Sequence, residues 1–514
     1  MKIKSLLIGM LACTALVGCS NEEDVLNGEQ ATGKESYLAV SVRNANVASR
    51  ATDGGFEDGS EEENVVKNAV FYFFDAEKNA YIVSEDGTKS YLEPSLTMSE
   101  ETETDNVEEI SNKVMVIKNS KNVPPKYMVA VLNAPAALKK NLSLNKLEEE
   151  VGAYNGNAED GFVMSNSVYM HNVTGLAVNA SEISIENLGA NEKEALDNPV
   201  NIYVERVAAK VRVLAEGESF NTGQEFGGKK VYAKILGWNV TNVKSQANLL
   251  KKINTSWTDT ELGFSGWNDA TNFRSYWADT EDTGETTHPH NWGALSNLIS
   301  ASNYYYENTG SQKSQLLVRA EFVDDKGESL KNTIAEWYGA RYTFEDLKVA
   351  FANAVAGKIF IKSSADASTA ESIKPADIDF FQAENTEADG KRHLCYAKLA
   401  ASSASSGEKI FVNEKNEALT VAAVNEILKA VRPAKIWKAG GYYYFNIDHL
   451  DNAEGLVRNH VYEITINGIN GLGTPVYEPE KIIIPEKPGT DESFISAQVN
   501  ILSWKVVKQT VILE

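Results

Sequence analysis

Apolar and polar residues alternate along much of the chain. In the segment 206–213, four apolar positions fall on one face and three basic side chains on the other, the period-two pattern of a half-buried β-strand. Similar patterns predict strands at 37–43, 65–74, 113–118, 126–133, 202–214, 230–241, 316–323, 442–447, 460–467 and 495–513. Helical spacing is confined to 342–356 and 420–431, with a short turn near 146–151. This balance predicts a mostly β fold made of β-sandwiches rather than a parallel α/β sheet.

One stretch between two strong strand patterns is polar and rich in glycine. It covers residues 216–228 and reads EGESFNTGQEFGG. Such a composition is typical of a connection between folded units. We therefore predict an N-terminal β-sandwich at 51–222 and a C-terminal one at 223–514.

The overall charge narrows the possible partners. The 514 residues include 72 acidic and 49 basic side chains, which gives a formal net charge of −23. Nucleic-acid binding requires clustered Lys and Arg side chains that neutralise phosphates, so no nucleic-acid partner is expected. The acidity keeps a secreted protein soluble but identifies no partner.

Few residues are candidates for a catalytic site or a metal site. Cys13, Cys19 and Cys395 cannot build a disulfide framework or a cysteine zinc site, and we expect Cys395 to be buried and structural. A metal site at His288 and His290 is possible, but a solvated loop is the favoured interpretation. The acidic run 57–63 is likewise expected to be solvated and not to bind calcium. No catalytic motif occurs in a usable context, so we predict no catalytic residue, no cofactor, no metal and no enzymatic activity.

The N-terminus resembles a bacterial lipoprotein signal. Lys2 and Lys4 precede an apolar run at 5–17 that ends in the sequence LVGC at 16–19. We predict a signal peptide at 1–18 and lipid, including palmitate, on Cys19; a plain secretory signal is the alternative. The acidic cluster that follows, at 20–24, resembles a surface-export signal of Bacteroidetes lipoproteins.

The first predicted strand precedes a segment that suits proteolysis. Leu38, Val40 and Val42 point to one side of the strand at 37–43. Residues 48–55 are then small, polar and glycine-rich, and the acidic run follows. This pattern predicts an exposed loop that proteases can reach.

An ordered set of segments resembles the fimbrillin superfamily of Bacteroidetes type V pili. The set most resembles the major stalk subunit of the minor, Mfa-type fimbriae. It consists of GFVMSNSVY at 161–169, VERVAAKV at 204–211, ILGWNVTN at 235–242, RSYW at 274–277, YYYENT at 304–309, VRNHVYEITI at 457–466, GLGTP at 471–475 and WKVV at 504–507.

The resemblance implies two transthyretin-like β-sandwich domains and a maturation route. A precursor lipoprotein of the outer membrane would be cut by an Arg-specific protease after Arg50, so that Ala51 becomes the new N-terminus. Arg43 is a competing site, but it lies inside the strand pattern. Residues 19–50 would form a propeptide whose first strand, with Leu38, Val40 and Val42, is displaced.

The resemblance also implies assembly into a cell-surface fimbrium by donor-strand exchange. A C-terminal strand at about 495–514 of another copy would fill the vacated groove. It would present Leu502, Trp504 and Val506 on one face and Val507, Val511 and Leu513 on the other. The implied partners are further copies of the chain, anchor and tip subunits, and ligands on host or bacterial surfaces. The implied roles are adhesion, biofilm formation and virulence.

A second hypothesis is a monomeric surface lipoprotein that remains anchored through Cys19 and binds a glycan or a host protein. N-terminal sequencing of protein shed from cells separates the two hypotheses. An N-terminus at Ala51 indicates a pilus subunit, and a lipid-blocked Cys19 indicates an anchored binder.

Overall fold

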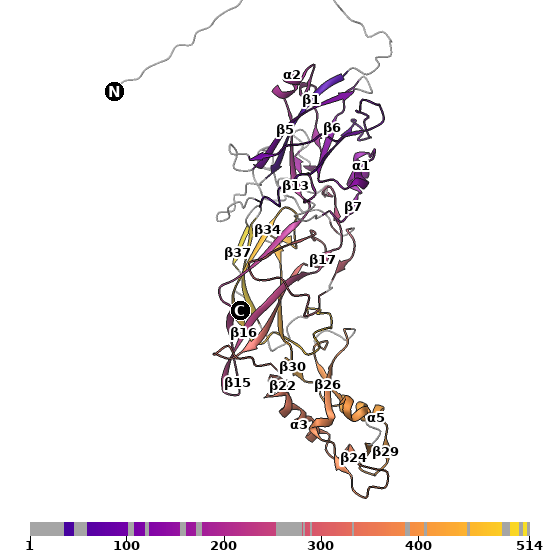
Figure 1. The fold of residues 1–514 in the computed structure, drawn as a ribbon, viewed down its shortest axis with the longest axis vertical. Helices are drawn as coiled ribbons and strands as arrows, with labels where there is room; N and C mark the ends of the chain where they lie inside the picture. Colours follow the sequence, from indigo (N-terminus) through magenta and orange to yellow (C-terminus); the bar gives the residue numbers. More distant parts are fainter. Residues whose placement is uncertain are drawn as a thin grey trace, which may run out of the picture.

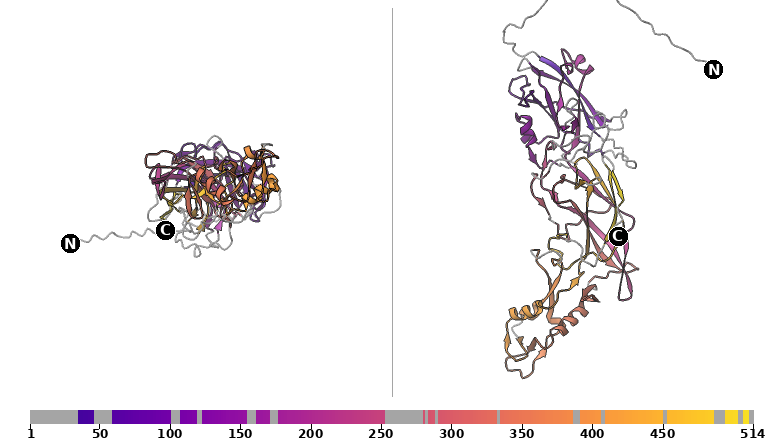
Figure 2. Two further views of the ribbon diagram at one scale, coloured as in Figure 1. Left: turned by 90° about the horizontal axis from the view of Figure 1, so that it is seen from below. Right: turned by 180° about the vertical axis from the view of Figure 1, so that it is seen from behind.

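The computed structural model of the protein is an elongated molecule whose sheets follow one another along its long axis (Figures 1 and 2). It describes residues 35–45, 59–100, 107–118, 123–154, 161–170, 177–252, 280, 283–287, 290–331, 334–385, 391–405, 409–449, 453–485, 494–502 and 507–510. Strands far outnumber helices among these residues, which confirms the predicted mostly β fold class. None of their helices combines the length and the apolar character that a bilayer crossing requires.

The N-terminal sheet is ten-stranded. Its main path runs β3-β2-β6-β8-β13-β1-β5-β4, while β11 pairs with β6 and β12 with β1. The strands are β1 (Glu35–Ala45), β2 (Ala69–Phe74), β3 (Tyr91–Leu92), β4 (Ser99–Glu100), β5 (Val107–Lys118), β6 (Tyr127–Leu132), β8 (Met164–Asn166), β11 (Ser181–Glu182), β12 (Leu188–Gly189) and β13 (Val200–Arg206).

This sheet curls onto itself. Phe71 of β2 and Ile117 of β5 share one hydrophobic core, although their strands lie near opposite ends of the path. The backbone N–H of Lys118 also donates to the carbonyl of Val83, 2.9 Å away. The outer face of β2 carries a second core, in which Tyr72 packs with Leu147 of α1 (Leu144–Glu148). Because both faces are buried, β2 is a continuous apolar run.

Two five-stranded sheets form a β-sandwich beyond the N-terminal sheet (Figure 1). One contains β20 (Ser302–Tyr305), β14 (Ala209–Ala215), β34 (Val461–Asn470), β36 (Phe494–Leu502) and β37 (Val507–Thr510), in that order. The other contains β15 (Ser219–Phe226), β16 (Lys229–Thr241), β21 (Gln315–Val323), β31 (Gly440–Asn446) and β35 (Thr474–Val476). Side chains such as Val211, Trp238 and Ile464 enclose a shared core between them.

The chain passes from the N-terminal sheet to the β-sandwich earlier than the boundary expected at 222/223. The strand predicted at 202–214 is split into β13 and β14: Val207 belongs to a core of the N-terminal sheet, whereas Ala209 belongs to the sandwich core. The polar stretch 216–228 is not a linker but contains β15, which pairs with β16. As an edge strand with mostly exposed side chains, β15 needs few apolar residues, so its composition resembles that of a loop.

The two longest helices lie in an insertion between β21 and β31 at one end of the molecule (Figure 1). Helices α3 (Phe344–Ala354) and α5 (Val421–Lys429) pack Phe351 and Leu428 into a separate core. Thr343 and Thr420 cap their N-termini. The remaining elements are α4 (Ala401–Ser405), β22 (Ala335–Trp337), β23 (Ala340–Tyr342), β24 (Phe360–Lys362), β25 (Glu371–Ser372), β26 (Ile378–Gln382), β27 (Cys395–Leu399), β28 (Ile410–Val412), β29 (Ala418–Leu419) and β30 (Lys435–Ile436).

Candidate strand-exchange site

Strand β1 lies inside the N-terminal sheet with a neighbour along each edge. On one edge it runs antiparallel to β5 over its whole length. On the other edge Tyr37 and Leu38 pair with β12, and residues 40–44 run parallel to β13. Departure of β1 would therefore leave two rows of backbone N–H and C=O groups without partners, one on each side of the gap.

The side chains of β1 contribute to the core. Leu38 and Val40 are fully buried among the core residues of the N-terminal sheet. Ala39 and Ser41 are buried as well, and α2 (Glu192–Asp197) packs against the strand (Figure 1). Val42 lies in the same strand, in register with Ile202 of β13. The structure thus places all three residues of the predicted displaceable strand in a sheet. Burying a Leu or Val side chain contributes about 1.5–3 kcal/mol.

The C-terminal strands β36 and β37 form an antiparallel pair at the edge of the sandwich. Strand β36 pairs with β34, with Leu502 opposite Val461. Val507 lies in β37 opposite Ile501, and β36 is the only ladder partner of β37 among the described strands. Departure of an edge strand leaves no gap inside a sheet, so these last strands are geometrically the easiest to release.

Several predicted positions lie outside the described residues. They are Cys19, Arg50, Ala51, Trp504, Val506, Val511 and Leu513. In the sequence, Arg50 and Ala51 stand between the end of β1 and Gly59, where the description resumes.

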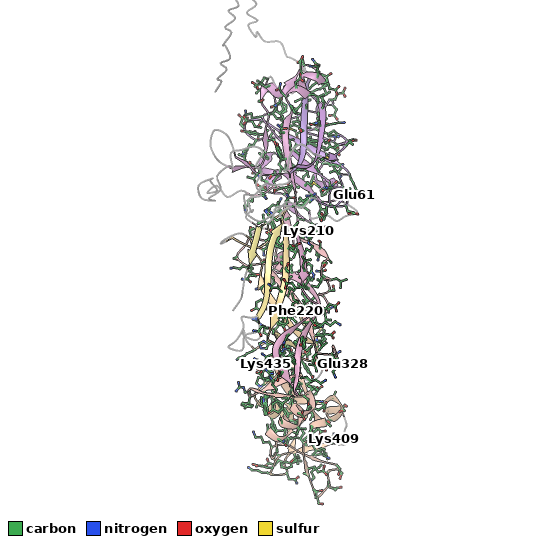
Figure 3. All side chains as sticks on the ribbon, turned by 90° about the vertical axis from the view of Figure 1, so that its left-hand side faces the viewer. Glu61, Lys210, Phe220, Glu328, Lys409 and Lys435 are labelled. Carbon is green, nitrogen blue, oxygen red and sulfur yellow. The ribbon has the colours of Figure 1, made fainter. Side chains whose placement is uncertain are left out.

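A group of buried charges lies where the N-terminal sheet meets the sandwich, at the level of Lys210 in Figure 3. We call it the domain joint; it comprises Glu63, Glu205, Arg206, Lys210, Lys251, Glu307, Arg458, Asn459 and His460, all buried. The sequence pattern does not predict this cluster. Glu63 was expected to be solvated in the acidic run, and that expectation was wrong because the carboxylate meets buried cationic and hydroxyl partners.

Glu63 anchors the segment that follows the predicted cleavage position. Its carboxylate lies 2.9 Å from Nζ of Lys210 and accepts a hydrogen bond from the Tyr304 hydroxyl. Burial would raise the pKa of Glu63, but the Tyr304 hydrogen bond and the Lys210 charge outweigh it and hold the pKa below its ordinary value. Glu63 is therefore an ionised group fixed between the two bodies.

Two further buried ion pairs belong to the joint. Nζ of Lys251 lies 2.7 Å from the Glu205 carboxylate, and both side chains are almost wholly shielded from solvent. Burial lowers the pKa of Lys251, although the Glu205 charge opposes the shift. Arg458 donates to Glu307 over 2.8 Å and to the carbonyls of Asn248 and Leu249.

The ring of His460 makes the joint sensitive to acid. Burial and the charge of Lys251 lower the pKa of His460 to about 3, although the contact to the Arg458 carbonyl opposes the shift. The unfolded chain binds a proton near pH 6.5, so the stabilisation is complete above that pH and is lost as the pH falls towards 3. Between pH 7 and pH 4.5, protonation of His460 in the unfolded chain is expected to lower the free energy of unfolding by about 2–3 kcal/mol.

Urea unfolding of wild type and His460→Gln at both pH values measures this contribution of His460 to the free energy of unfolding. The free energy of unfolding of the variant should fall by about 2–3 kcal/mol less than that of wild type between pH 7 and pH 4.5. His393→Gln, at a half-buried histidine of the insertion, is the matched control and should follow wild type. Equal losses in wild type and His460→Gln would show that the acid sensitivity lies elsewhere.

The other candidate residues have structural surroundings. His290 is not solvated but buried, with Nε2 2.6 Å from the carbonyl of Val240. Cys395 is fully buried in the core of the insertion, as predicted, and burial raises the pKa of its thiol. Across the described ranges, no three His, Cys, Asp or Glu side chains are grouped so that they could hold a metal ion.

A family model confirms the superfamily resemblance. The model of the major fimbrial subunit protein type IV, Fimbrillin, C-terminal, matches residues 437–510, which include β31, β34, β35, β36 and β37. This part of the chain is therefore similar to the C-terminal part of the fimbrillins, in agreement with the resemblance seen in the sequence. No curated protein matches the chain.

Three solved structures of bacterial proteins resemble the molecule at low sequence identity. A candidate cell adhesion protein from Bacteroides eggerthii is 11% identical, with a TM-score of 0.40 over 93% of this chain and 98% of that one. Another, from Parabacteroides distasonis, is 12% identical, with a TM-score of 0.40 over 92% and 98%. The tip fimbrial protein Mfa3 from Porphyromonas gingivalis is 13% identical, with a TM-score of 0.31 over 92% and 100%.

Proposed function

We propose that the protein is a structural, non-enzymatic subunit of a cell-surface fimbrium that polymerises by donor-strand exchange, and that it belongs to the stalk. The observation that carries this proposal is the position of β1. It is a centrally paired strand with Leu38 and Val40 fully buried, and in the sequence it stands upstream of Arg50. One cut after Arg50 makes it a separate peptide.

The maturation route begins with export as an outer-membrane lipoprotein that carries lipid on Cys19. An Arg-specific protease then cuts between Arg50 and Ala51 and severs the link between β1 and the fold. While the link exists, β1 is held at a high effective concentration beside its groove, and cleavage removes that advantage. The intact precursor is therefore kept from assembling prematurely.

The vacated groove offers a strong binding site for a strand. Both of its edges present ladder groups, and its floor is the apolar core around Phe71 and Ile202. A C-terminal strand of a second copy restores both ladders and buries alternate side chains, among them Leu502, Trp504 and Val506 or Val507, Val511 and Leu513. About four such side chains contribute roughly 6–12 kcal/mol before the cost of ordering.

Donor and acceptor lie on different bodies of the same chain, so the exchange is head to tail. A heterologous contact of this kind does not close on itself, and it produces a filament. The filament takes up anchor and tip subunits at its ends and serves adhesion to host or bacterial surfaces, biofilm formation and virulence.

Treating the purified precursor with an Arg-specific protease tests this function. Cleavage after Arg50 is expected to give a ladder of oligomers on gels under mild denaturation. Arg50→Lys should block both cleavage and laddering, whereas Arg43→Lys, the matched control at the competing arginine, should ladder like wild type. Removal of residues 503–514 should permit cleavage but abolish the ladder. An unchanged monomer after clean cleavage of wild type would instead support a monomeric surface lipoprotein that binds a glycan or a host protein.

A further inference from the structure

Strand β13 borders the groove that β1 would vacate, and it depends on β1 for much of its backbone pairing. Residues 200–204 of β13 pair with β1, whereas only residues 204–206 pair with β8 on the opposite edge. The N–H of Ser167 extends the second edge by one contact, to the carbonyl of Tyr203. Within the described part of the chain, residues 200–202 therefore have no ladder partner other than β1. Once β1 leaves, residues 200–202 are held in position through the residues that follow them in β13, above all Glu205 and Arg206.

Those two residues are held by the domain joint. The Glu205 carboxylate contacts Nζ of Lys251 at 2.7 Å and accepts a hydrogen bond from the Ser167 hydroxyl at 3.1 Å. The backbone N–H of Arg206 donates to Oδ1 of Asn459 at 3.2 Å, and its Nε donates to the carbonyl of Glu63 at 3.1 Å. The exposed fraction of Glu205, Arg206 and Lys251 is zero.

No partner in this set of contacts comes from residues 35–45. Lys251 follows β18 (Ala247–Asn248), Asn459 precedes β34, and Glu63 lies beyond the predicted cleavage position. The contacts can therefore persist when β1 has left. Buried ion pairs add little net stability compared with apolar residues of equal volume, but they are directional and costly to break singly. An ionic joint at this point fixes geometry more than it adds stability.

We infer that the domain joint is a clamp that keeps β13 in place while the groove is empty, and that Glu205 and Lys251 are positioning residues for strand exchange. The inference rests on the proposed function. The clamp holds the last residues of β13 against β8, so that the wall of the groove remains formed for the incoming strand. Without it, the empty groove spends less time in the conformation that accepts a donor, and assembly slows in proportion.

The experiment follows precursors cleaved by an Arg-specific protease. The double variant Glu205→Gln/Lys251→Gln removes both charges and leaves no buried ion unpaired. We expect its polymerisation after cleavage to be about tenfold slower than that of wild type, as when the competent fraction falls to about a tenth. Lys146→Gln/Glu149→Gln removes an exposed ion pair on α1, with side chains 64% and 63% exposed, and should polymerise like wild type.

Hydrogen exchange distinguishes a clamp that is needed only after β1 has left from a contact that stabilises the fold in the precursor as well. The amides of residues 204–206 should be equally protected in the precursors of wild type and double variant, because β1 then supports the sheet. After cleavage they should stay protected in wild type and exchange at least about tenfold faster in the double variant. Asn459→Gly is a milder second variant, which keeps the positive φ of 57° accessible and deletes the acceptor for the Arg206 backbone N–H. It should shift both readouts in the same direction by a smaller factor.

Three outcomes would contradict the clamp, and the experiment distinguishes the one that also contradicts the proposed function. Wild type that is cleanly cleaved yet never polymerises would overturn the proposed function and the clamp with it. Equal polymerisation rates in wild type and double variant would overturn the clamp alone. So would loss of protection at 204–206 already in the variant precursors, since that would make the joint an ordinary support of the fold.

Discussion

A precursor that carries Leu38→Ala together with Val40→Ala is expected to lose about 4–7 kcal/mol of the free energy of unfolding of its N-terminal sheet. Both side chains are fully buried and contact the core that also contains Phe71 and Ile117. Truncation removes their apolar area and leaves a cavity, since β5 and β13 hold the strand on both edges and limit collapse. Urea unfolding of the uncleaved precursor measures the loss.

The same substitutions should make β1 a poorer occupant of its groove after cleavage. A loss of about 4 kcal/mol corresponds to roughly a thousandfold weaker retention of the cleaved peptide. Val116→Ala is the matched control, because Val116 lies on neighbouring β5 but is 46% exposed. Its free energy of unfolding should stay within about 0.5 kcal/mol of wild type. A double variant as stable as this control would show that β1 is not a core strand, which would remove the basis of the proposed exchange.

The strand β1 could be predicted from the sequence because its signal, the alternation of apolar side chains, lies within the strand itself. Leu38, Val40 and Val42 alternate with smaller or polar residues, and a strand with this pattern has only one way to bury its apolar face. The strands β16, β21 and β34 and the helices α3 and α5 were predicted for the same reason. Each presents its apolar side chains at the period of its own backbone, so no knowledge of distant partners is needed.

The domain joint escaped prediction because its partners are distant in the chain. Arg206 lies 253 residues from Asn459, and Arg458 lies 151 from Glu307. The alternation correctly separates the two faces of β14 over residues 209–213, but a single sequence does not show that Glu63 covers the polar side chain of Lys210. The available signal was the concentration of charge in two otherwise apolar motifs, VERVAAKV at 204–211 and VRNHVYEITI at 457–466. Both belong to the set that carries the superfamily resemblance.

The second large effect is expected at Arg458. Replacing it by Met leaves the Glu307 carboxylate fully buried without its guanidinium partner, which should cost about 3–5 kcal/mol of the free energy of unfolding. Urea unfolding at neutral pH measures this loss. Lys374→Met is the matched control, because it breaks an ion pair with Glu371 whose side chains are 66% and 70% exposed, and it should cost less than about 1 kcal/mol.

The double variant Glu307→Gln/Arg458→Met divides the role of Arg458 into two parts. Removing the carboxylate's charge should restore the part of the loss that comes from an unpaired buried ion. The carbonyls of Asn248 and Leu249 would still lose the hydrogen bonds that Arg458 donates, and each lost hydrogen bond should cost about 0.5–1.5 kcal/mol. Full recovery in the double variant would mean that Arg458 only balances Glu307. Partial recovery would mean that it also ties the segment ending in Leu249 to the sandwich, as a rigid joint between the two bodies requires. No loss in the single variant would contradict both roles.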